Sequence, residues 1–288
     1  MKKNFIFKGV GTALVTPFRR GEIDYPALDR LIERQISGGV DALIIGGTTG
    51  EAATLSNRER YSLYTHATDR INGRCAVVLG TGTNDTKVAI KHTEAAERLG
   101  ADGALVVTPY YNKGTACGVI AHYKAIAAST NLPIILYNVP SRTGVNIGIN
   151  ELLELSKLEN VVGIKEASDS TDRLVKISAL GDVLPLYAGN DSQTYTALAL
   201  GGAGVISVVS NLYPEKMKHI TDAYFSGRGK ESLAEQLSLL PLIDAMFLET
   251  NPAPLKYAMA KMRLCREEMR LPMMEISDAT RRTIDALV

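Results

Sequence analysis

Short apolar runs alternate with longer amphipathic segments along most of the chain. Runs rich in Val, Ile, Leu and Ala predict eight strands, at residues 11–17, 41–47, 75–82, 103–109, 133–139, 161–166, 184–190 and 203–209. Several of the segments between them have helical spacing, namely 25–39, 85–100 and 114–130. Strands that are apolar throughout and alternate with helices are typical of a parallel sheet covered by helices.

The number of strands favours an α/β fold of the (β/α)₈ TIM-barrel type, with an open doubly wound sheet as the alternative. Candidate functional residues follow several different strands rather than one switch point, which also favours the barrel. We assign residues 1–225 to the catalytic barrel. Residues 226–288 contain further apolar helical segments, and we expect them to form a C-terminal helical region packed on the barrel.

Composition narrows the classes of function. The chain has 288 residues, of which 45% are hydrophobic and 22% charged, enough for a large core. The net charge of +1 gives no indication of a nucleic-acid or anionic-membrane partner. No apolar run approaches the roughly 20 residues of a membrane span. Three scattered cysteines, Cys75, Cys117 and Cys265, argue against a disulfide framework or a zinc site and predict a cytoplasmic protein.

A lysine interrupts the sixth predicted strand, "VVGIKE". Strand alternation places Lys165 and Gly163 on one face and Glu166 on the other. If Lys165 faces the barrel interior, Gly163 leaves space below it, and desolvation would depress the lysine pKa enough for a nucleophile near pH 7. The alternative is a structural lysine at the strand end, paired with a carboxylate such as Glu166.

Other strand ends carry hydroxyls and an arginine, and in a TIM barrel they share the face that holds the active site. Tyr137 is either a proton relay beside Lys165 or a core tyrosine. Arg142 is either a fork for a substrate carboxylate or a solvated loop residue. The turn "GGTTGE" at 46–51 lacks the lysine of a phosphate-binding loop, but its N–H groups could bind a carboxylate. No His, Asp and Glu cluster has metal-ligand spacing, so no metal is expected.

Six motifs occur in the order typical of one family: "GTTGE", "TPYYN", "YNVPSRTG", "GIKEAS", "AGND" and "GGAGVISV". Over essentially its whole length the chain resembles the pyruvate-dependent lysine-imine lyases and synthases, often named after N-acetylneuraminate lyase. Within them it is most similar to the synthases of lysine and diaminopimelate biosynthesis, which join pyruvate to L-aspartate-4-semialdehyde. The alternative is N-acetylneuraminate lyase or another sugar-acid aldolase. Arg142 favours the synthase, because lyases usually have an apolar or small residue there.

The resemblance implies a chemical role for four residues. Lys165 would form an imine with pyruvate, so that no metal or organic cofactor is needed. Tyr137, Thr49 and Tyr111 would relay protons, with Tyr111 reaching in from a neighbouring subunit. The family therefore also implies a homo-oligomer, a tetramer built as a dimer of tight dimers.

Further residues would bind the substrates, again by resemblance. Thr48 and Thr49 would hold the pyruvate carboxylate, and Arg142 would hold the carboxylate of the semialdehyde. Gly189 and the backbone of Ile206 would line the site near the lysine and the incoming amine.

A regulatory site departs from the family pattern. Lysine-inhibited relatives use His and Glu side chains at the subunit interface, where this chain has Asn57, Arg60 and Val88. A cationic Arg60 and an apolar Val88 are poor partners for an ammonium group. We therefore expect L-lysine to inhibit this protein weakly or not at all.

Overall fold

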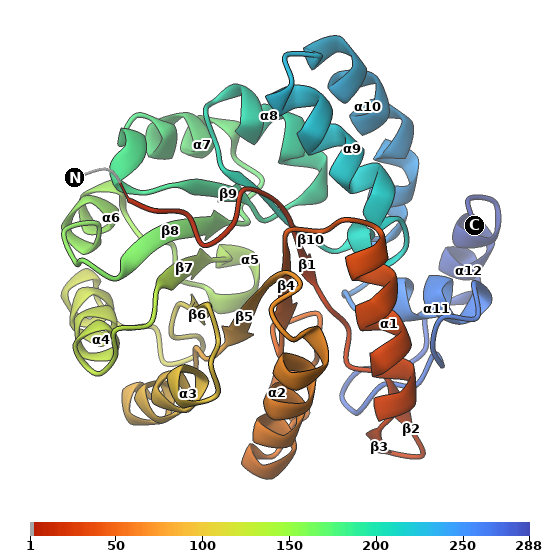
Figure 1. Cartoon of the computed structure of the whole chain (residues 1–288), viewed down its shortest axis with the longest axis horizontal. Helices are drawn as coiled ribbons and strands as arrows, with labels where there is room; N and C mark the ends of the chain where they lie inside the picture. Colours follow the sequence, from red (N-terminus) through yellow and green to blue (C-terminus); the bar gives the residue numbers. More distant parts are fainter. Residues whose placement is uncertain (1–2) are drawn as a thin grey trace.

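The predicted strands form a closed barrel in the computed structural model, which describes residues 3–288; residues 1 and 2 of the predicted barrel segment lie outside this range. The strands are β1 (Gly9–Ala13), β4 (Ala42–Ile45), β5 (Ala76–Gly80), β6 (Gly103–Val107), β7 (Ile134–Asn138), β8 (Val161–Glu166), β9 (Leu186–Ala188) and β10 (Gly204–Ser207). They are parallel and follow the order β1-β10-β9-β8-β7-β6-β5-β4 around the barrel (Figure 1). The (β/α)₈ prediction is confirmed.

Helices surround this barrel and extend beyond it. They are α1 (Tyr25–Ser37), α2 (Asn57–Ile71), α3 (Thr86–Arg98), α4 (Ala116–Ala128), α5 (Pro140–Thr143), α6 (Ile149–Leu155), α7 (Thr171–Ser178), α8 (Thr194–Ala199), α9 (Pro214–Phe225), α10 (Gly229–Ala245), α11 (Ala253–Lys261) and α12 (Asp278–Asp285). Short 3₁₀ segments are η1 (Ala52–Thr54), η2 (Gly181–Val183), η3 (Asp191–Gln193) and η4 (Val209–Asn211). None of the helices within residues 3–288 is long and apolar enough to cross a membrane.

Local sequence explains where two of the helices begin, α1 and α2. Asp24 precedes α1, and its carboxylate accepts a hydrogen bond from the Ala27 N–H at 3.1 Å. Ser56 and Glu59 form a reciprocal capping box at the start of α2. The segments predicted at 25–39, 85–100 and 114–130 correspond to α1, α3 and α4, each slightly shorter than predicted.

The first strand differs from its prediction at 11–17, because β1 begins at Gly9 and ends at Ala13. The following residues leave the barrel, and the Thr16 hydroxyl donates to the Gly50 carbonyl at 2.7 Å. Pro17 has no N–H for a sheet hydrogen bond. A hairpin that was not predicted follows, formed by β2 (Phe18–Arg19) and β3 (Glu22–Ile23).

Two apolar layers hold the barrel together. Alternate strand residues fill its interior, among them Ile44, Val78, Leu105 and Ile135, while the other face of each strand packs against the helices. Gly80 lets β5 approach the turn after β4, because a Cβ at this position would lie 2.3 Å from the Gly46 carbonyl oxygen. This close approach holds the turn after β4 against β5 at the C-terminal end of the barrel.

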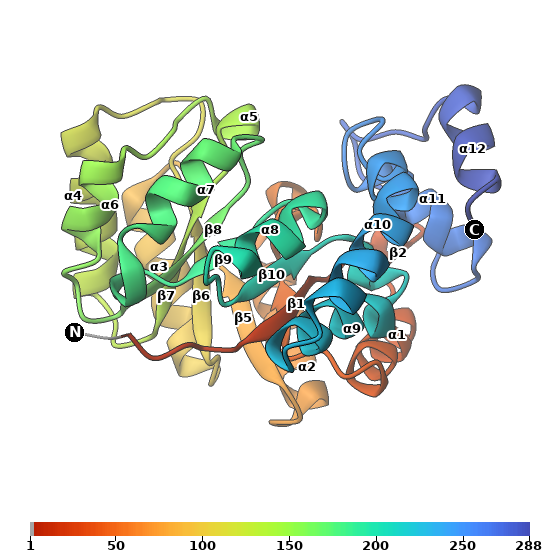
Figure 2. The ribbon, with the colours of Figure 1, turned by 90° about the horizontal axis from the view of Figure 1, so that it is seen from above.

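The last three helices lie together on one side of the barrel. α10 packs along α9, and α11 contacts α12. In Figure 2 these helices lie beside α1 and α9, away from α4 and α6. The helical nature of this region is as predicted, and α9 ends at Phe225, although the domain boundary there stays a prediction.

Candidate active site

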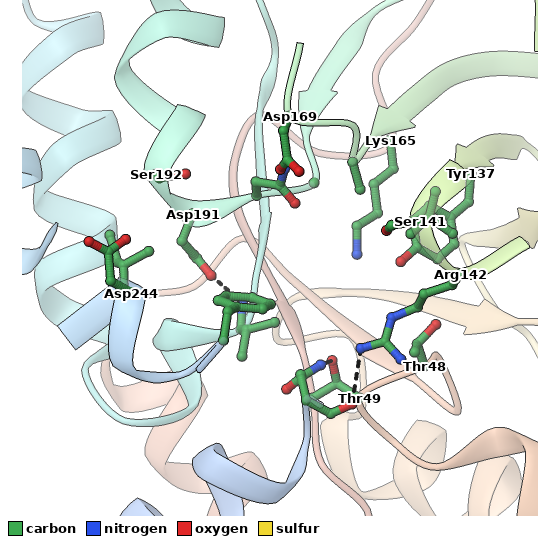
Figure 3. A pocket seen from close by; sticks show the side chains of 18 residues that line it. Thr48, Thr49, Tyr137, Ser141, Arg142, Lys165, Asp169, Asp191, Ser192 and Asp244 are labelled. Atoms are coloured by element: carbon green, nitrogen blue, oxygen red, sulfur yellow. Dashed lines mark hydrogen bonds between the residues drawn. The ribbon is translucent and has the colours of Figure 1, made fainter. Parts of the chain in front are cut away.

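A cavity of about 390 Å³ opens at the C-terminal ends of the barrel strands. Residues from several strand ends and from the C-terminal region line it, and Figure 3 shows the Lys165 amine pointing into it, between Asp191 on one side and Tyr137 and Arg142 on the other. The lining residues are Thr48, Thr49, Tyr137, Val139, Ser141, Arg142, Lys165, Ala167, Asp169, Gly189, Asn190, Asp191, Ser192, Val208, Ile243, Asp244, Phe247 and Asn251. Five of the predicted site residues other than Lys165 are therefore brought to one cavity: Thr48, Thr49, Tyr137, Arg142 and Gly189.

Lys165 lies near the end of β8 and is buried, with 5% of the residue exposed. It is the register partner of Tyr137 on β7, and its Nζ lies 4.4 Å from the centroid of the Tyr137 ring. Glu166 is on the opposite face of the strand, where it pairs with Arg173 at 2.8 Å. Glu166 is therefore not the ion-pair partner of Lys165, in contrast to the alternative of a structural Lys165–Glu166 pair.

Gly163 has a different use from the predicted one. A Cβ at this position would lie 3.1 Å from a ring carbon of Tyr187 and 3.1 Å from the Pro185 carbonyl oxygen. The Tyr187 ring fills this space, and its hydroxyl donates to the Phe7 carbonyl at 2.6 Å. Gly163 thus makes room for the buried Tyr187 ring in the barrel interior and not for Lys165.

The turn after β4 presents two threonines to the cavity. The N–H groups of Gly50, Glu51 and Ala52 donate to the carbonyls of Gly47 and Thr48 within the turn. Within residues 3–288, no acceptor takes the N–H groups of Thr48 and Thr49. The turn can therefore offer these amides to an anionic ligand group.

Arg142 lies on the short helix α5, close to a residue that sequence reasoning missed. Its Nη2 donates to the Asn251 carbonyl at 3.0 Å, and the Asn251 side chain donates to the Thr49 hydroxyl at 3.0 Å. Asn251 precedes α11 in the C-terminal region, where no local pattern marked it. One residue thus connects the predicted carboxylate-binding arginine to the threonine turn.

A second missed residue is Asp191, which belongs to the "AGND" motif and is fully buried. Its Oδ2 accepts from the N–H groups of Val208 and Val209 at 2.9 and 3.2 Å. Burial raises the pKa of the Asp191 carboxyl, while these donors and the charge of Lys165 act in the opposite direction. In the sequence, the one signal for Asp191 was its place in the "AGND" motif.

Two predicted site residues lie outside the lining. Tyr111 is 90% exposed and has a φ of 70°, so within a single chain it projects away from the barrel. Ile206 is fully buried in the barrel interior, in the same apolar cluster as Tyr137. The predicted role of Tyr111 requires a second copy of the chain.

A neighbouring cavity of about 280 Å³ shares four lining residues with the first, namely Thr48, Tyr137, Arg142 and Asn251. Arg60 lines it, and its guanidinium donates to the Ala52 carbonyl at 2.7 Å and to the Tyr64 hydroxyl at 3.2 Å. Arg60 is therefore a fixed cation beside the threonine turn.

In the described part of the chain, no group of three or more His, Cys, Asp or Glu side chains could hold a metal ion.

Comparison with known proteins gives a consistent result. The model of the dihydrodipicolinate synthetase family matches residues 6–288. A 4-hydroxy-tetrahydrodipicolinate synthase of Clostridium novyi is 47% identical over 95% of this chain and 93% of its own. The crystal structure of dihydrodipicolinate synthase from Thermotoga maritima superposes with a TM-score of 0.96, at 43% identity and 98% coverage of both chains. The dihydrodipicolinate synthase of Acinetobacter baumannii in complex with pyruvate gives a TM-score of 0.95 at 37% identity, with 97% coverage of both chains.

Proposed function

Because the chain belongs to the dihydrodipicolinate synthetase family, we propose that it condenses pyruvate with L-aspartate-4-semialdehyde through an imine on Lys165, giving 4-hydroxy-tetrahydrodipicolinate. The observation that carries this proposal is the Lys165 amine, which projects into the cavity beside Tyr137, between Asp191 and Arg142. A lysine amine can attack a keto carbon, and the protonated imine that results acts as an electron sink.

The reaction begins with pyruvate. The nitrogen lone pair of Lys165 attacks the keto carbon, and loss of water gives the imine. The free amides of Thr48 and Thr49 bind the pyruvate carboxylate and fix the keto carbon in front of the amine. Removal of a methyl proton then gives an enamine, and Tyr137 and Thr49 carry this proton toward solvent together with Tyr111 of a neighbouring copy.

The second substrate completes the reaction. Arg142 holds the carboxylate of the semialdehyde while the enamine carbon attacks its aldehyde carbon, forming the new carbon–carbon bond. The aldehyde oxygen takes a proton and becomes a hydroxyl. The substrate amine then attacks the imine carbon and displaces Lys165, which closes the ring and regenerates the free lysine. Each well-placed proton transfer contributes roughly 10²–10⁴-fold to the rate.

The role proposed for Tyr111 supports an oligomer, and we propose a homotetramer made of two tight dimers. Sedimentation velocity should give a species of four chains. Full turnover by a monomer would contradict the relay through Tyr111. The three free cysteines, Cys75, Cys117 and Cys265, are compatible with a cytoplasmic location.

Trapping of the imine tests the function directly. Wild-type protein incubated with pyruvate and borohydride should gain one reduced pyruvate on the peptide that contains Lys165, as measured by peptide mass spectrometry. Lys165→Ala should abolish both this label and nearly all turnover. Absence of label from the wild-type peptide would remove the imine mechanism. Turnover of N-acetylneuraminate in place of the semialdehyde would identify a lyase of the wider family.

A further inference from the structure

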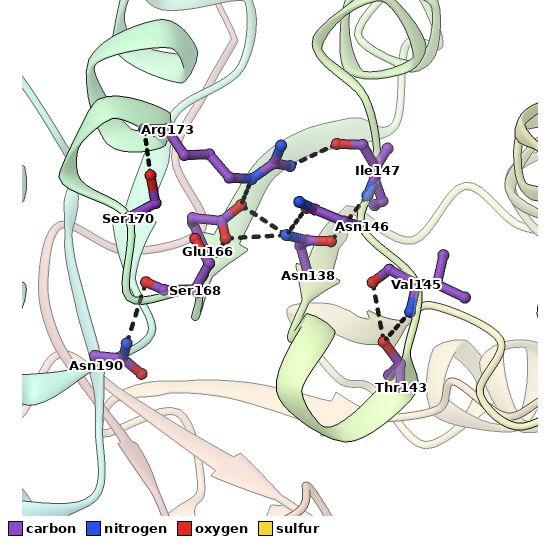
Figure 4. Close-up of polar contacts among 10 residues, drawn as sticks. All are labelled: Asn138, Thr143, Val145, Asn146, Ile147, Glu166, Ser168, Ser170, Arg173 and Asn190. Atoms are coloured by element: carbon purple, nitrogen blue, oxygen red, sulfur yellow. Dashed lines mark hydrogen bonds and ion pairs between the residues drawn. The ribbon is translucent and has the colours of Figure 1, made fainter.

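A buried carboxylate lies directly behind the proposed nucleophile. Glu166 follows Lys165 in β8, faces the helix layer and is fully buried. Its two oxygens accept from the Asn138 side chain at 2.9 and 3.0 Å, from the Ser168 N–H at 3.0 Å and from Arg173 Nε at 2.8 Å. Donors from three chain segments therefore converge on one carboxylate (Figure 4).

Two of these donors also hold the segment after α5. The Asn138 Oδ1 accepts from the Ile147 N–H at 3.0 Å, and Arg173 Nη2 donates to the Ile147 carbonyl at 2.6 Å. Glu166, Asn138, Arg173 and Ile147 thus form a closed ring of polar contacts (Figure 4), which we call the rear network.

Each main residue of the site is covalently close to this network. Asn138 follows Tyr137, and Glu166 follows Lys165, with the pairs in register across β7 and β8. Arg142 lies on α5, between the network residues Asn138 and Ile147. A shift of the rear network would therefore move the amine, the phenol and the guanidinium relative to one another.

We propose that the rear network is a positioning device, in which Glu166 fixes Lys165 against Tyr137 and Arg173 fixes the segment that carries Arg142. The proposal rests on the proposed imine at Lys165. A buried charge is not an efficient way to stabilise a fold, since apolar residues of similar volume often serve as well or better. A carboxylate that accepts several hydrogen bonds from fixed directions does, however, restrict the geometry of the chain around it.

The decisive variant is Glu166→Gln. Its amide has nearly the same shape but turns one acceptor into a donor, which then faces the N–H groups of Asn138, Ser168 or Arg173. We expect the single-turnover rate of imine formation, measured by rapid quench into borohydride, to fall by roughly 10- to 100-fold, the order associated with misplacement by about 1 Å. The KM for pyruvate should change much less than kcat, because the Thr48–Thr49 turn is not part of the network.

A matched control lies at the opposite end of the same barrel. Asp41 precedes β4, and its carboxylate accepts from the Val10 N–H at 2.8 Å and from the Lys218 ammonium at 2.8 and 3.0 Å. Asp41→Asn should lower the Tm through a similar loss of acceptors but leave the imine rate within about twofold of wild type, since it is far from the reacting atoms.

Arg173→Lys keeps the test decisive if Glu166→Gln does not fold. It retains the charge but cannot bridge Glu166 and Ile147 with two nitrogens. We expect Arg173→Lys to lower the rate of imine formation by a smaller factor than Glu166→Gln. The rate is measured below the temperature at which the variant unfolds.

The positioning role would be overturned if folded Glu166→Gln and Arg173→Lys formed the imine at the wild-type rate. It would also be overturned if Asp41→Asn lowered the imine rate as much as Glu166→Gln does. That result differs from failure of the proposed function, which would show as absence of the Lys165 label in the wild type itself.

Discussion

The ion pair between Lys256 and Glu51 provides a quantitative test of how the C-terminal helices support the active site. Its side chains are 0% and 2% exposed, and Lys256 also donates to the Glu268 carbonyl at 2.9 Å. Glu51 ends the turn that carries Thr48 and Thr49, and its other oxygen accepts from the Arg270 N–H at 3.1 Å. The pair therefore ties α11 and the segment after it to the threonine turn.

Lys256→Met preserves most of the side-chain length but leaves Glu51 as a buried carboxylate without its cation. Removal of one partner of a buried pair costs about 3–5 kcal/mol of the free energy of unfolding. At roughly 2–4 °C per kcal/mol for a domain of this size class, the Tm should fall by roughly 6–20 °C. The KM for pyruvate should also rise, because the amides of the turn lose their support.

The assay is denaturant unfolding of wild type, Lys256→Met and the double variant Lys256→Met/Glu51→Gln. The double variant should recover part of the lost stability, since a neutral amide is less costly to bury than an unpaired carboxylate. The reasoning is refuted if the free energy of unfolding of Lys256→Met is within 1 kcal/mol of the wild-type value. It is also refuted if Glu51→Gln lowers the free energy of unfolding further when it is added to Lys256→Met.

Three further predictions concern binding and pH. Arg142→Ala should weaken use of the semialdehyde far more than it slows imine formation with pyruvate, and equal losses in the two assays would make Arg142 structural. L-Lysine should inhibit weakly or not at all because of the fixed cation of Arg60, which strong inhibition at sub-millimolar lysine in a steady-state assay would disprove. Burial lowers the pKa of His92 and His122 to about 4. Below pH 6.5 the unfolded chain therefore takes up protons that the folded chain does not, and stability should fall as the pH drops from 6.5 toward 4. Thermal unfolding of His92→Gln/His122→Gln should depend less on pH between 6.5 and 4.5, whereas an unchanged slope would contradict this assignment.

Strand and helix periodicity predicted the eight strands, and the spread of candidate residues over several strand ends favoured the barrel over an open doubly wound sheet. All eight strands occur where the apolar runs predicted them, with ends that differ by a few residues. The alternation in "VVGIKE" correctly separated Lys165 from Glu166, because successive strand side chains point to opposite faces. The same alternation did not reveal that Tyr187 occupies the space above Gly163, since that depends on the neighbouring strand.

The sequence by itself determined the order of strands and helices along the chain, the separation of Lys165 and Glu166 onto opposite faces of their strand and the motifs that mark the family, because these depend on local spacing and residue type. The tertiary structure decided the contacts that complete the site. Asn251 meets Thr49 across 202 positions, and Lys256 meets Glu51 across 205. Such pairs carry no periodic signal, because they exist only once barrel closure and the packing of the C-terminal helices bring distant segments to the same end of the barrel.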